Sequence, residues 1–324
     1  MLDPNLNIWE EIMKTFISIV ALALLPAAAA AADRPDWAFP SKSAGPAVAS
    51  PPDDGQAKHV PGSTKSYTQK EIDSINSPPD WFPNEHPPTP NIVAHGKGDM
   101  VRACMSCHLP TGYGHPENSR LAGSPAAYII RQIDNFRSGV RKGEGAGNMV
   151  KFAKYMTDED AKAAADYFAS IKPGRWTKVV ETDTVPKTYF KGTRRLQLPD
   201  GGKEAIGNRI IEVPQDPELV ELRDTHAGFV SYVPPGSVAK GENIVTTGAG
   251  KTIPCAICHG QGLKGLGEVP PLAGRSPGTI ARAIYYIQTG DRGGPSVALM
   301  KGVVEKLTGD DVLAISAYVA SLEP

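Results

Sequence analysis

Residues 104–108 read Cys-Met-Ser-Cys-His, and residues 255–259 repeat the pattern as Cys-Ala-Ile-Cys-His. Two thiols three residues apart can add across the two vinyl groups of one porphyrin, and the histidine that follows is placed to bind its iron. The pattern therefore predicts two covalently bound haem c groups. The predicted attachment residues are Cys104, Cys107, His108, Cys255, Cys258 and His259.

Two other uses of Cys-x-x-Cys compete with this interpretation. Zinc sites combine two such pairs, and thioredoxin-like proteins use one pair as a redox dithiol, but the dithiol chemistry explains neither histidine. The chain has 4 cysteines, and the two motifs contain all of them. No thiol is left to form a structural disulfide.

The N-terminus has the order of a secretory signal. Lys14 precedes the apolar run 16–25, and the alanines of 27–32 precede polar residues. This charged, apolar, small-residue order predicts a signal peptide over 1–32 and export to the periplasm. The acidic residues before Met13 suggest that Met13 is the natural start. An uncleaved anchor over 12–32 is the alternative.

The charge balance excludes some partners. Removing residues 1–32 takes one lysine and three acids from the 34 basic and 35 acidic residues, which leaves 33 and 32. A chain so close to neutral gives no reason to expect nucleic-acid binding. Membrane association is expected only through a partner or an uncleaved signal.

Residues 33–85 are rich in proline and poor in periodic apolar positions, which predicts an extended N-terminal arm. Thr68 and Glu71 fit a capping box that opens a short helix. Trp37, Trp81 and Phe82 are candidate anchors for the arm on a haem domain. A mobile tether is the alternative.

An internal repeat without gaps organises the rest of the chain. An offset of 151 residues carries Cys104 onto Cys255 and also relates many residues outside the motifs. Duplicated domains are the simplest explanation, and we predict them over 86–173 and 233–324. The matched pairs are Leu121-Ala122-Gly123 with Leu272-Ala273-Gly274, Arg131 with Arg282, Gly139 with Gly290, Thr157 with Thr308, Asp160 with Asp311 and Tyr167 with Tyr318.

Both predicted domains carry the same helix signals. Ser124-Pro125 and Ser276-Pro277 read as an N-cap with proline at the first helical position, and Gly139 and Gly290 end the helices that follow. Thr157 and Thr308 open a terminal helix. An N-terminal helix is predicted over 238–247, whereas the first domain offers only 91–95 for one.

The sixth iron ligand can be predicted by elimination. In the second domain Met300 is the only methionine, and His259 is already the proximal ligand. The repeat then indicates Met149 in the first domain, while Met156 aligns with Leu307 and reads as core. The predicted metal ligands are therefore His108, Met149, His259 and Met300.

Other histidines compete with Met149 for the first iron. His95 and His115 both flank the first motif, but the offset places Thr246 and Leu266 at these positions in the second domain. Solvated loop positions are expected for both, with a histidine ligand kept as the alternative. His59, His86 and His226 are expected at the surface.

These motifs together resemble the class I c-type cytochromes, particularly the two-domain di-haem cytochrome c-four group of the bacterial periplasm. The shared features are Cys-x-x-Cys-His, Leu-Ala-Gly before an amphipathic helix, a methionine, and a Thr-x-x-Asp helix start. The resemblance implies a mostly α chain of two helical haem domains, with each iron held by histidine and methionine. It also implies electron transfer and no catalytic residue.

Residues 174–232 depart from that resemblance, because a shorter linker is expected there. The segment contains short apolar runs bounded by turn residues, which predict a small irregular β insertion. The predicted strands lie at 179–180, 189–190, 196–198, 210–213 and 229–232. Shielding of the haem edges and recognition of a partner are both open roles for it.

The sequence thus predicts single-electron transfer between a redox donor and acceptor, such as a dehydrogenase, an oxidase or another cytochrome. A permanent cytochrome subunit of a dehydrogenase or oxidase complex is the alternative. A di-haem peroxidase needs one iron that opens to peroxide, and the matched methionines disfavour it. A thiosulfate dehydrogenase-like enzyme needs an unusual distal ligand, and no cysteine is left to supply one.

Overall fold

The first haem unit is a small helical bundle around one apolar core. The computed structural model describes residues 34–39 and 53–324, so the predicted signal peptide lies outside the described residues. Buried side chains of α5 and α7 meet in this core, including Ile133, Phe136 and Phe168. The elements of the unit are α3 (Asn91–Ala94), β1 (Gly96–Asp99), α4 (Met105–His108), α5 (Ala126–Arg137), α6 (Gly147–Ala153) and α7 (Asp158–Ser170).

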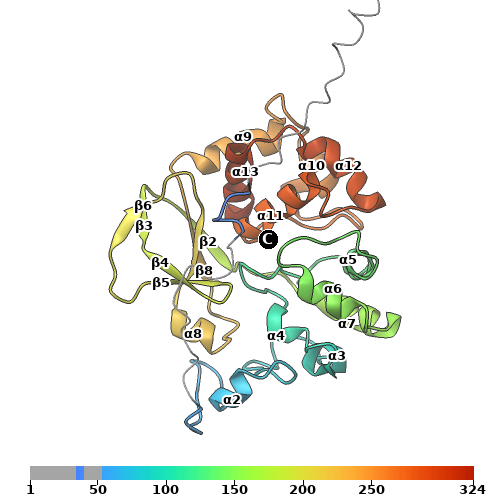
Figure 1. Cartoon of the computed structure of the whole chain (residues 1–324), viewed down its shortest axis with the longest axis vertical. Coiled ribbons are helices and arrows are strands. Elements are labelled where there is room, and N and C mark those ends of the chain that lie inside the picture. The colour runs from blue at the N-terminus through green and yellow to red at the C-terminus, as the bar shows by residue number, and fades with distance from the viewer. Residues whose placement is uncertain (1–33, 40–52) are drawn as a thin grey trace, which may run out of the picture. The chain divides into compact units, whose positions relative to one another are not determined.

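The second unit repeats the bundle with a longer first helix (Figure 1). Helix α9 packs against the terminal helix, and Gly241 lets the two backbones approach, since a Cβ there would lie 2.0 Å from the Ala314 carbonyl oxygen. The predicted helix over 238–247 is confirmed. The elements are α9 (Ser237–Thr247), α10 (Ala256–His259), η1 (Gln261–Leu263), α11 (Pro277–Gln288), α12 (Pro295–Val304) and α13 (Gly309–Ser321).

The terminal helices of the two units begin in the same way. Thr157 opens α7 and Thr308 opens α13, each with a capping box to an aspartate three residues later. One face of each helix is buried at equivalent positions, which are Ala161, Ala165 and Phe168 in α7 and Val312, Ser316 and Val319 in α13. The glycines of the two Leu-Ala-Gly runs also match, because Gly123 (φ 69°) and Gly274 (φ 67°) each press against a proline, Pro173 and Pro324. The fold is therefore mostly α with two cytochrome c-like units.

The insertion between the units is a set of small sheets (Figure 1). Strand β2 pairs in parallel with β8, and β7 pairs antiparallel with β8 on its other side. Each predicted strand is found, and the sequence reading missed β3, β6 and α8. The elements are β2 (Thr177–Glu181), β3 (Thr184–Pro186), β4 (Thr188–Lys191), β5 (Arg194–Gln197), β6 (Lys203–Ala205), β7 (Ile211–Pro214), α8 (Pro217–Glu221) and β8 (Phe229–Val233).

The described part of the N-terminal arm is held by aromatic anchors. Helix α2 (Gln69–Ile72) starts at the predicted capping box. Trp81 and Phe82 are buried, and they pack in a cluster with Leu219 and Leu222 of the insertion. Trp81 and Phe82 therefore anchor the arm to the insertion, whereas the sequence predicts that they anchor it to a haem domain. Trp37 packs on a cluster that joins the insertion to α13.

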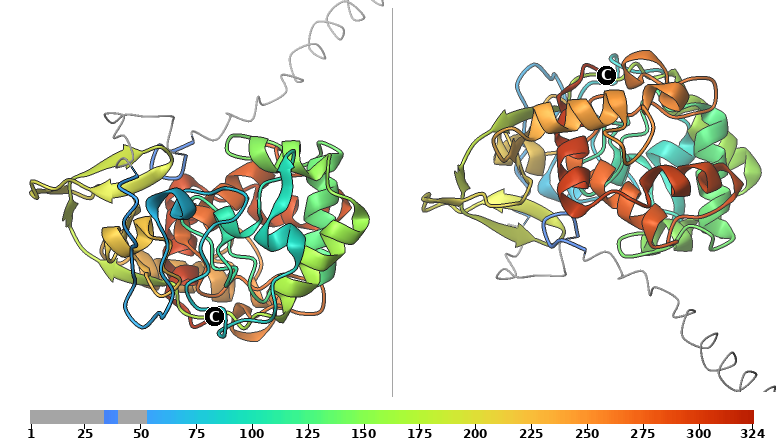
Figure 2. Two further views of the ribbon diagram at one scale, coloured as in Figure 1. Left: turned by 90° about the horizontal axis from the view of Figure 1, so that it is seen from below. Right: turned by 90° about the horizontal axis from the view of Figure 1, so that it is seen from above.

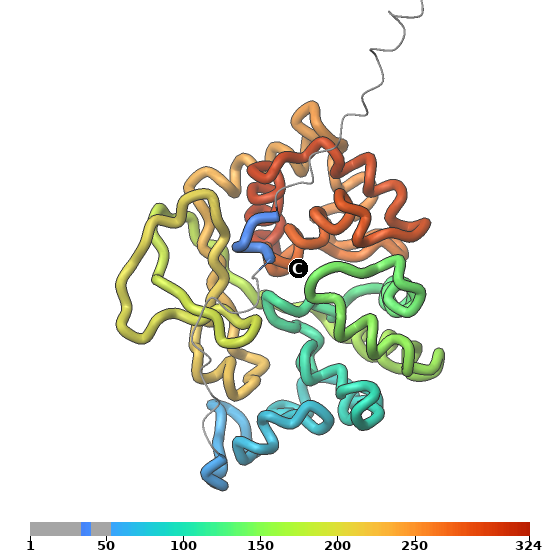
Figure 3. The backbone as a smooth tube through the Cα atoms, in the orientation of Figure 1, coloured from blue at the N-terminus to red at the C-terminus, as the bar shows by residue number. Residues whose placement is uncertain are grey.

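The two units contact each other through equivalent residues. The Lys142 amide donates to the Asp291 carbonyl at 2.7 Å, and the Gly293 amide donates to the Val140 carbonyl at 2.8 Å. The offset of 151 maps Val140 onto Asp291 and Lys142 onto Gly293, so the bridge is symmetric. Figures 2 and 3 show the green and red segments of the units side by side. Each unit therefore contributes the equivalent three residues to this bridge.

One predicted cap is wrong. Helix α11 starts at Ser276 as expected, but the N-cap position of α5 is Pro125 and has no side-chain cap. The Ser124 hydroxyl instead accepts a hydrogen bond from Arg275 of the second unit at 2.8 Å. The Ser124 side chain, which the sequence predicts as the cap of α5, therefore forms a contact between the two units instead.

Within residues 34–39 and 53–324, no helix has the length and apolar character needed to span a bilayer.

Candidate haem-attachment sites

The two Cys-x-x-Cys-His stretches form the same one-turn helix. Cys104 and Cys255 lie at the N-caps of α4 and α10, and the histidines are the last helical residues. The backbone then turns through a positive φ, 62° at Leu109 and 75° at Gly260. This geometry directs both thiols of a motif and its histidine toward one side of the loop.

The loop that follows each motif closes on the histidine by matched hydrogen bonds. His108 Nδ1 lies 2.9 Å from the Ser119 carbonyl oxygen, and His259 Nδ1 lies 2.9 Å from the Pro270 carbonyl oxygen. A carbonyl can only accept, so Nδ1 carries the proton in both rings. The Nε2 lone pair is left as the ligating atom, which is the arrangement that metal-binding histidines use.

Both imidazoles lie in apolar surroundings. Burial lowers the pKa of His108 to about 4 and also lowers the pKa of His259. Both rings are therefore neutral at neutral pH, and a neutral imidazole is the form that binds iron. Burial also raises the pKa of the Cys104 thiol to about 12 and that of the Cys255 thiol to about 11.

The two predicted distal methionines occupy matched helices. Met149 lies on α6 and packs, half-buried, against the core of unit one. Met300 is half-buried on α12. Met156 is 7% exposed and belongs to the core of unit one, as the repeat alignment suggested.

The other histidines do not all behave as expected. His95, His59 and His226 are exposed, but His115 is only 4% exposed and lies beside the Phe229 ring of β8. The expectation of a solvated loop for His115 is therefore wrong, because the insertion covers it. His86 was also expected at the surface, yet its side chain is 2% exposed and contacts Asp80 and Tyr167.

Buried and half-buried arginines gather between the two units, and sequence reasoning missed them. Arg120 donates to the carbonyls of Ala273 and Gly274, and Arg275 donates back to the Arg120 carbonyl. Arg141 and Arg292 form the centre of the symmetric bridge and both donate to Gln132. The offset of 151 maps Arg141 onto Arg292, so the repeat contained a signal for this pair.

These arginines lack acidic partners. Among the described residues, no carboxylate lies within ion-pair distance of Arg120, Arg141, Arg275 or Arg292, and the Nε atom of Arg292 has no hydrogen-bond partner. Burial alone would raise the pKa of Tyr128, but Arg292 and Arg141 lower it to about 8. The region between the units is therefore strongly positive and suited to buried anionic groups.

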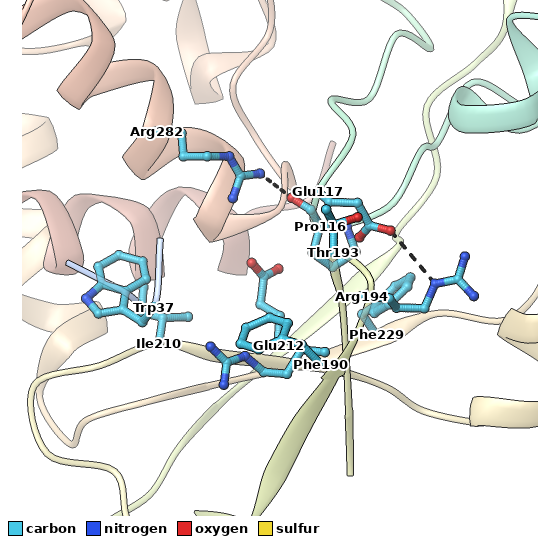
Figure 4. Close-up of a pocket in the computed structure, with 11 residues that line it drawn as sticks. Trp37, Pro116, Glu117, Phe190, Thr193, Arg194, Ile210, Glu212, Phe229 and Arg282 are labelled. Atoms are coloured by element: carbon cyan, nitrogen blue, oxygen red, sulfur yellow. Dashed lines mark hydrogen bonds and ion pairs between the residues drawn. The ribbon is translucent and has the colours of Figure 1, made fainter. Parts of the chain in front are cut away.

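A pocket lies where the insertion meets both units (Figure 4). Its lining includes Glu117 of unit one, Arg194 and Glu212 of the insertion and Arg282 of unit two. Glu117 faces Arg194 at 3.8 Å, and Arg282 donates to the Pro116 carbonyl. Burial raises the pKa of both glutamates. These contacts fix the insertion against the loop that follows the first motif.

The range that contains the first loop matches a known family. Residues 91–168 match the family described as cytochrome c oxidase, cbb3-type, subunit III. Cytochrome c-554(548) of Halomonas halodenitrificans is 36% identical over 73 residues, which are 22% of this chain and 88% of that protein. The chain belongs to the c-type cytochromes.

Two further relatives match this cytochrome over different lengths, and the first of them extends beyond one unit. Cytochrome c4 of Azotobacter vinelandii is 24% identical over 71% of this chain and 92% of that protein. The thiosulfate dehydrogenase electron acceptor of Stutzerimonas stutzeri is 36% identical over 22% of this chain, and that match spans 33% of the relative.

The residues of this cytochrome fit the covalent haem c of its family. Each loop offers two thiols and an imidazole with a free Nε2, and the arginines between the units offer unpaired positive charge for propionate carboxylates. In the described residues no group of three or more His, Cys, Asp or Glu side chains gathers as a metal site.

Proposed function

We propose that the chain is a periplasmic di-haem electron carrier that passes single electrons between redox partners. In this proposal Cys104, Cys107, Cys255 and Cys258 form the thioethers, His108 and His259 are the proximal ligands, and Met149 and Met300 are the distal ligands. Each haem, when bound, would take up and release one electron at its iron. The predicted domains are 86–173 and 233–324.

The observation that carries the proposal is the matched geometry of the two loops. Each histidine is oriented by one carbonyl at 2.9 Å, and the two carbonyls lie at positions that the offset of 151 relates. Two sites with the same donors in the same orientation should hold the same cofactor. An enzyme with two functionally distinct haems would instead need different ligands in the two units.

Apolar side chains line one side of the proposed site in unit one. The core of unit one surrounds His108 on the side of Phe168, whose ring centre lies 6.3 Å from the imidazole. A methionine sulfur stabilises the reduced iron relative to a second imidazole, and an apolar pocket disfavours the extra positive charge of the oxidised iron. Both features raise the reduction potential and leave no iron position for a substrate.

A dehydrogenase is the class of electron donor that we favour. Part of the chain resembles proteins described as thiosulfate dehydrogenase electron acceptors, which take electrons from a separate enzyme. A permanent cytochrome subunit of a larger complex differs only in how long the partner stays bound. Co-purification of the native protein distinguishes the two.

Spectroscopy with a redox titration tests the proposal. We expect two haems per chain by pyridine haemochrome assay, and a methionine-to-iron charge-transfer band in the near infrared with the intensity of two centres. A high-spin, five-coordinate iron in the resting oxidised protein would support a peroxidase. Two bis-histidine spectra would exclude the methionine ligands.

A further inference from the structure

The two attachment loops differ in what covers them. In unit one Ser106 and His115 are 8% and 4% exposed. The offset of 151 maps them onto Ile257 and Leu266 of unit two, which are 62% and 59% exposed. The same face of the same loop is therefore buried in one copy and open in the other.

The β insertion is what covers the loop of unit one. Arg223 follows α8 and donates a hydrogen bond to the Ser106 carbonyl at 2.6 Å. Phe229 of β8 lies against the His115 ring, with 6.0 Å between the ring centres. Leu109 of the loop is buried in one cluster with Trp176 and Phe229. The insertion thus places an arginine and an aromatic surface over this face.

The open face of unit two is apolar. Ile253, Ile257 and Leu266 belong to the small set of large apolar side chains that are exposed in the described residues. Cys258 is also exposed, whereas the equivalent Cys107 is half-buried. A haem joined to Cys258 would therefore be bonded to an atom at the surface, on the same loop as exposed apolar side chains. Exposed apolar side chains that gather in one place are typical of interaction sites.

We propose that this face, formed by Ile253, Ile257 and Leu266, is the docking surface for an external redox protein, and that the insertion closes the equivalent face of unit one. The inference rests on the proposed function. The contact of unit one indicates the chemistry of the partner, which should present an apolar surface with an arginine beside it, as the insertion does with Phe229 and Arg223. Electrons then enter and leave the chain at unit two.

The holoprotein can be tested on a gold electrode coated with a methyl-terminated monolayer, which presents an apolar surface. We expect direct electron exchange, and Ile257→Asp should slow it about tenfold or more, because a charge replaces an apolar contact. Met100→Asp is the matched control, since Met100 is an apolar side chain of unit one that is 43% exposed. It should exchange at the rate of the unaltered protein.

Solution titration separates failure of this inference from failure of the proposed function. Ile257→Asp should keep both haems, but its carboxylate lies next to Cys258 and should lower the reduction potential of the second haem. The titration gives that shift, and exchange rates compared at equal driving force then report docking alone. Equal rates for Ile257→Asp and the unaltered protein would overturn the docking surface while leaving electron transfer intact. Absence of any reversible redox signal in the unaltered protein would reject the proposed function itself.

Single-haem chains provide a second measurement. A chain without Cys255 and Cys258 keeps only the first haem and should exchange electrons with the apolar electrode much more slowly than a chain without Cys104 and Cys107. Equal rates for the two chains would overturn the assignment of unit two as the point of electron entry.

Discussion

Unit one and unit two have the same attachment loop but depend on different neighbours. Unit two has an eleven-residue first helix, α9, packed along α13, whereas the corresponding helix of unit one, α3, has four residues. In unit one the N-terminal arm contacts the loop. The Ala103 amide, next to the first motif, donates a hydrogen bond to the Ile75 carbonyl of the arm at 3.0 Å. The two units therefore share the geometry of the loop but differ in the segments that cover it.

The largest effect should come from removing one pair of thiols. Replacing Cys104 and Cys107 by alanine, or Cys255 and Cys258 by alanine, should each leave one haem per chain, because the loops are separate sites. Intact mass and pyridine haemochrome absorbance measure this directly. Loss of both haems from either double variant would mean that the units do not load independently.

Replacing methionines one at a time should distinguish the proposed iron ligands, Met149 and Met300, from the core residue Met156. Met149→Ala and Met300→Ala should each remove about half of the near-infrared charge-transfer intensity, since each methionine is the proposed distal ligand of one iron. Met156→Leu is the control, because Met156 is a buried core residue, and a volume-conserving swap there should keep the full band. A band lost with Met156→Leu would reassign the ligand of the first haem.

Arg120 of unit one and Arg275 of unit two should contribute about equally to the free energy of unfolding. Arg120→Met and Arg275→Met each leave buried carbonyls without a donor, and each should lower the free energy of unfolding by about 1–3 kcal/mol. Arg131→Met removes an ion pair with Glu268 whose carboxylate side chain is 65% exposed, and it should cost less than about 1 kcal/mol. Denaturant titration of the holoproteins compares the three. A larger loss of unfolding free energy for Arg131→Met than for the other two variants would contradict the idea that the buried arginine contacts stabilise the interface.

The smallest expected effect is a pH dependence at the helix starts. Burial alone would raise the pKa values of Asp160 and Asp311, but hydrogen bonds from Lys97 and Thr157, and from Lys251 and Thr308, lower them. A depressed pKa adds stability above the unfolded pKa and loses it as pH falls through the folded value. Asp160→Asn and Asp311→Asn should each cost about 1 kcal/mol at pH 7 and less below pH 4. Thermal melts at both pH values measure this.

Local patterns in the sequence predicted the helices and the strands well. The capping boxes at Thr68, Thr157 and Thr308 and the strand at 229–232 depend on neighbouring residues, so they can be found without tertiary information. The unpredicted strands β3 and β6 are three residues each and exist because they pair with each other. Strands this short have no distinctive residue pattern of their own, so the sequence does not predict them.

The site was predicted only where its residues are close in sequence. Each Cys-x-x-Cys-His loop is local, and its repeat could be read directly. The burial of His115 depends on Phe229, more than a hundred residues away, so a solvated position was a natural but wrong expectation. The arginines between the units were visible as an equivalent pair, Arg141 and Arg292, yet only the fold shows that they meet.

The symmetric bridge between Val140–Lys142 and Asp291–Gly293 has the form of an isologous dimer contact, in which one patch binds its own copy. If the two units were separate polypeptides, they would form the same pair of hydrogen bonds only when they met in solution. Joined in one polypeptide, the two halves meet at an effective concentration that the connecting segment sets. Their association then no longer depends on how much protein the cell makes.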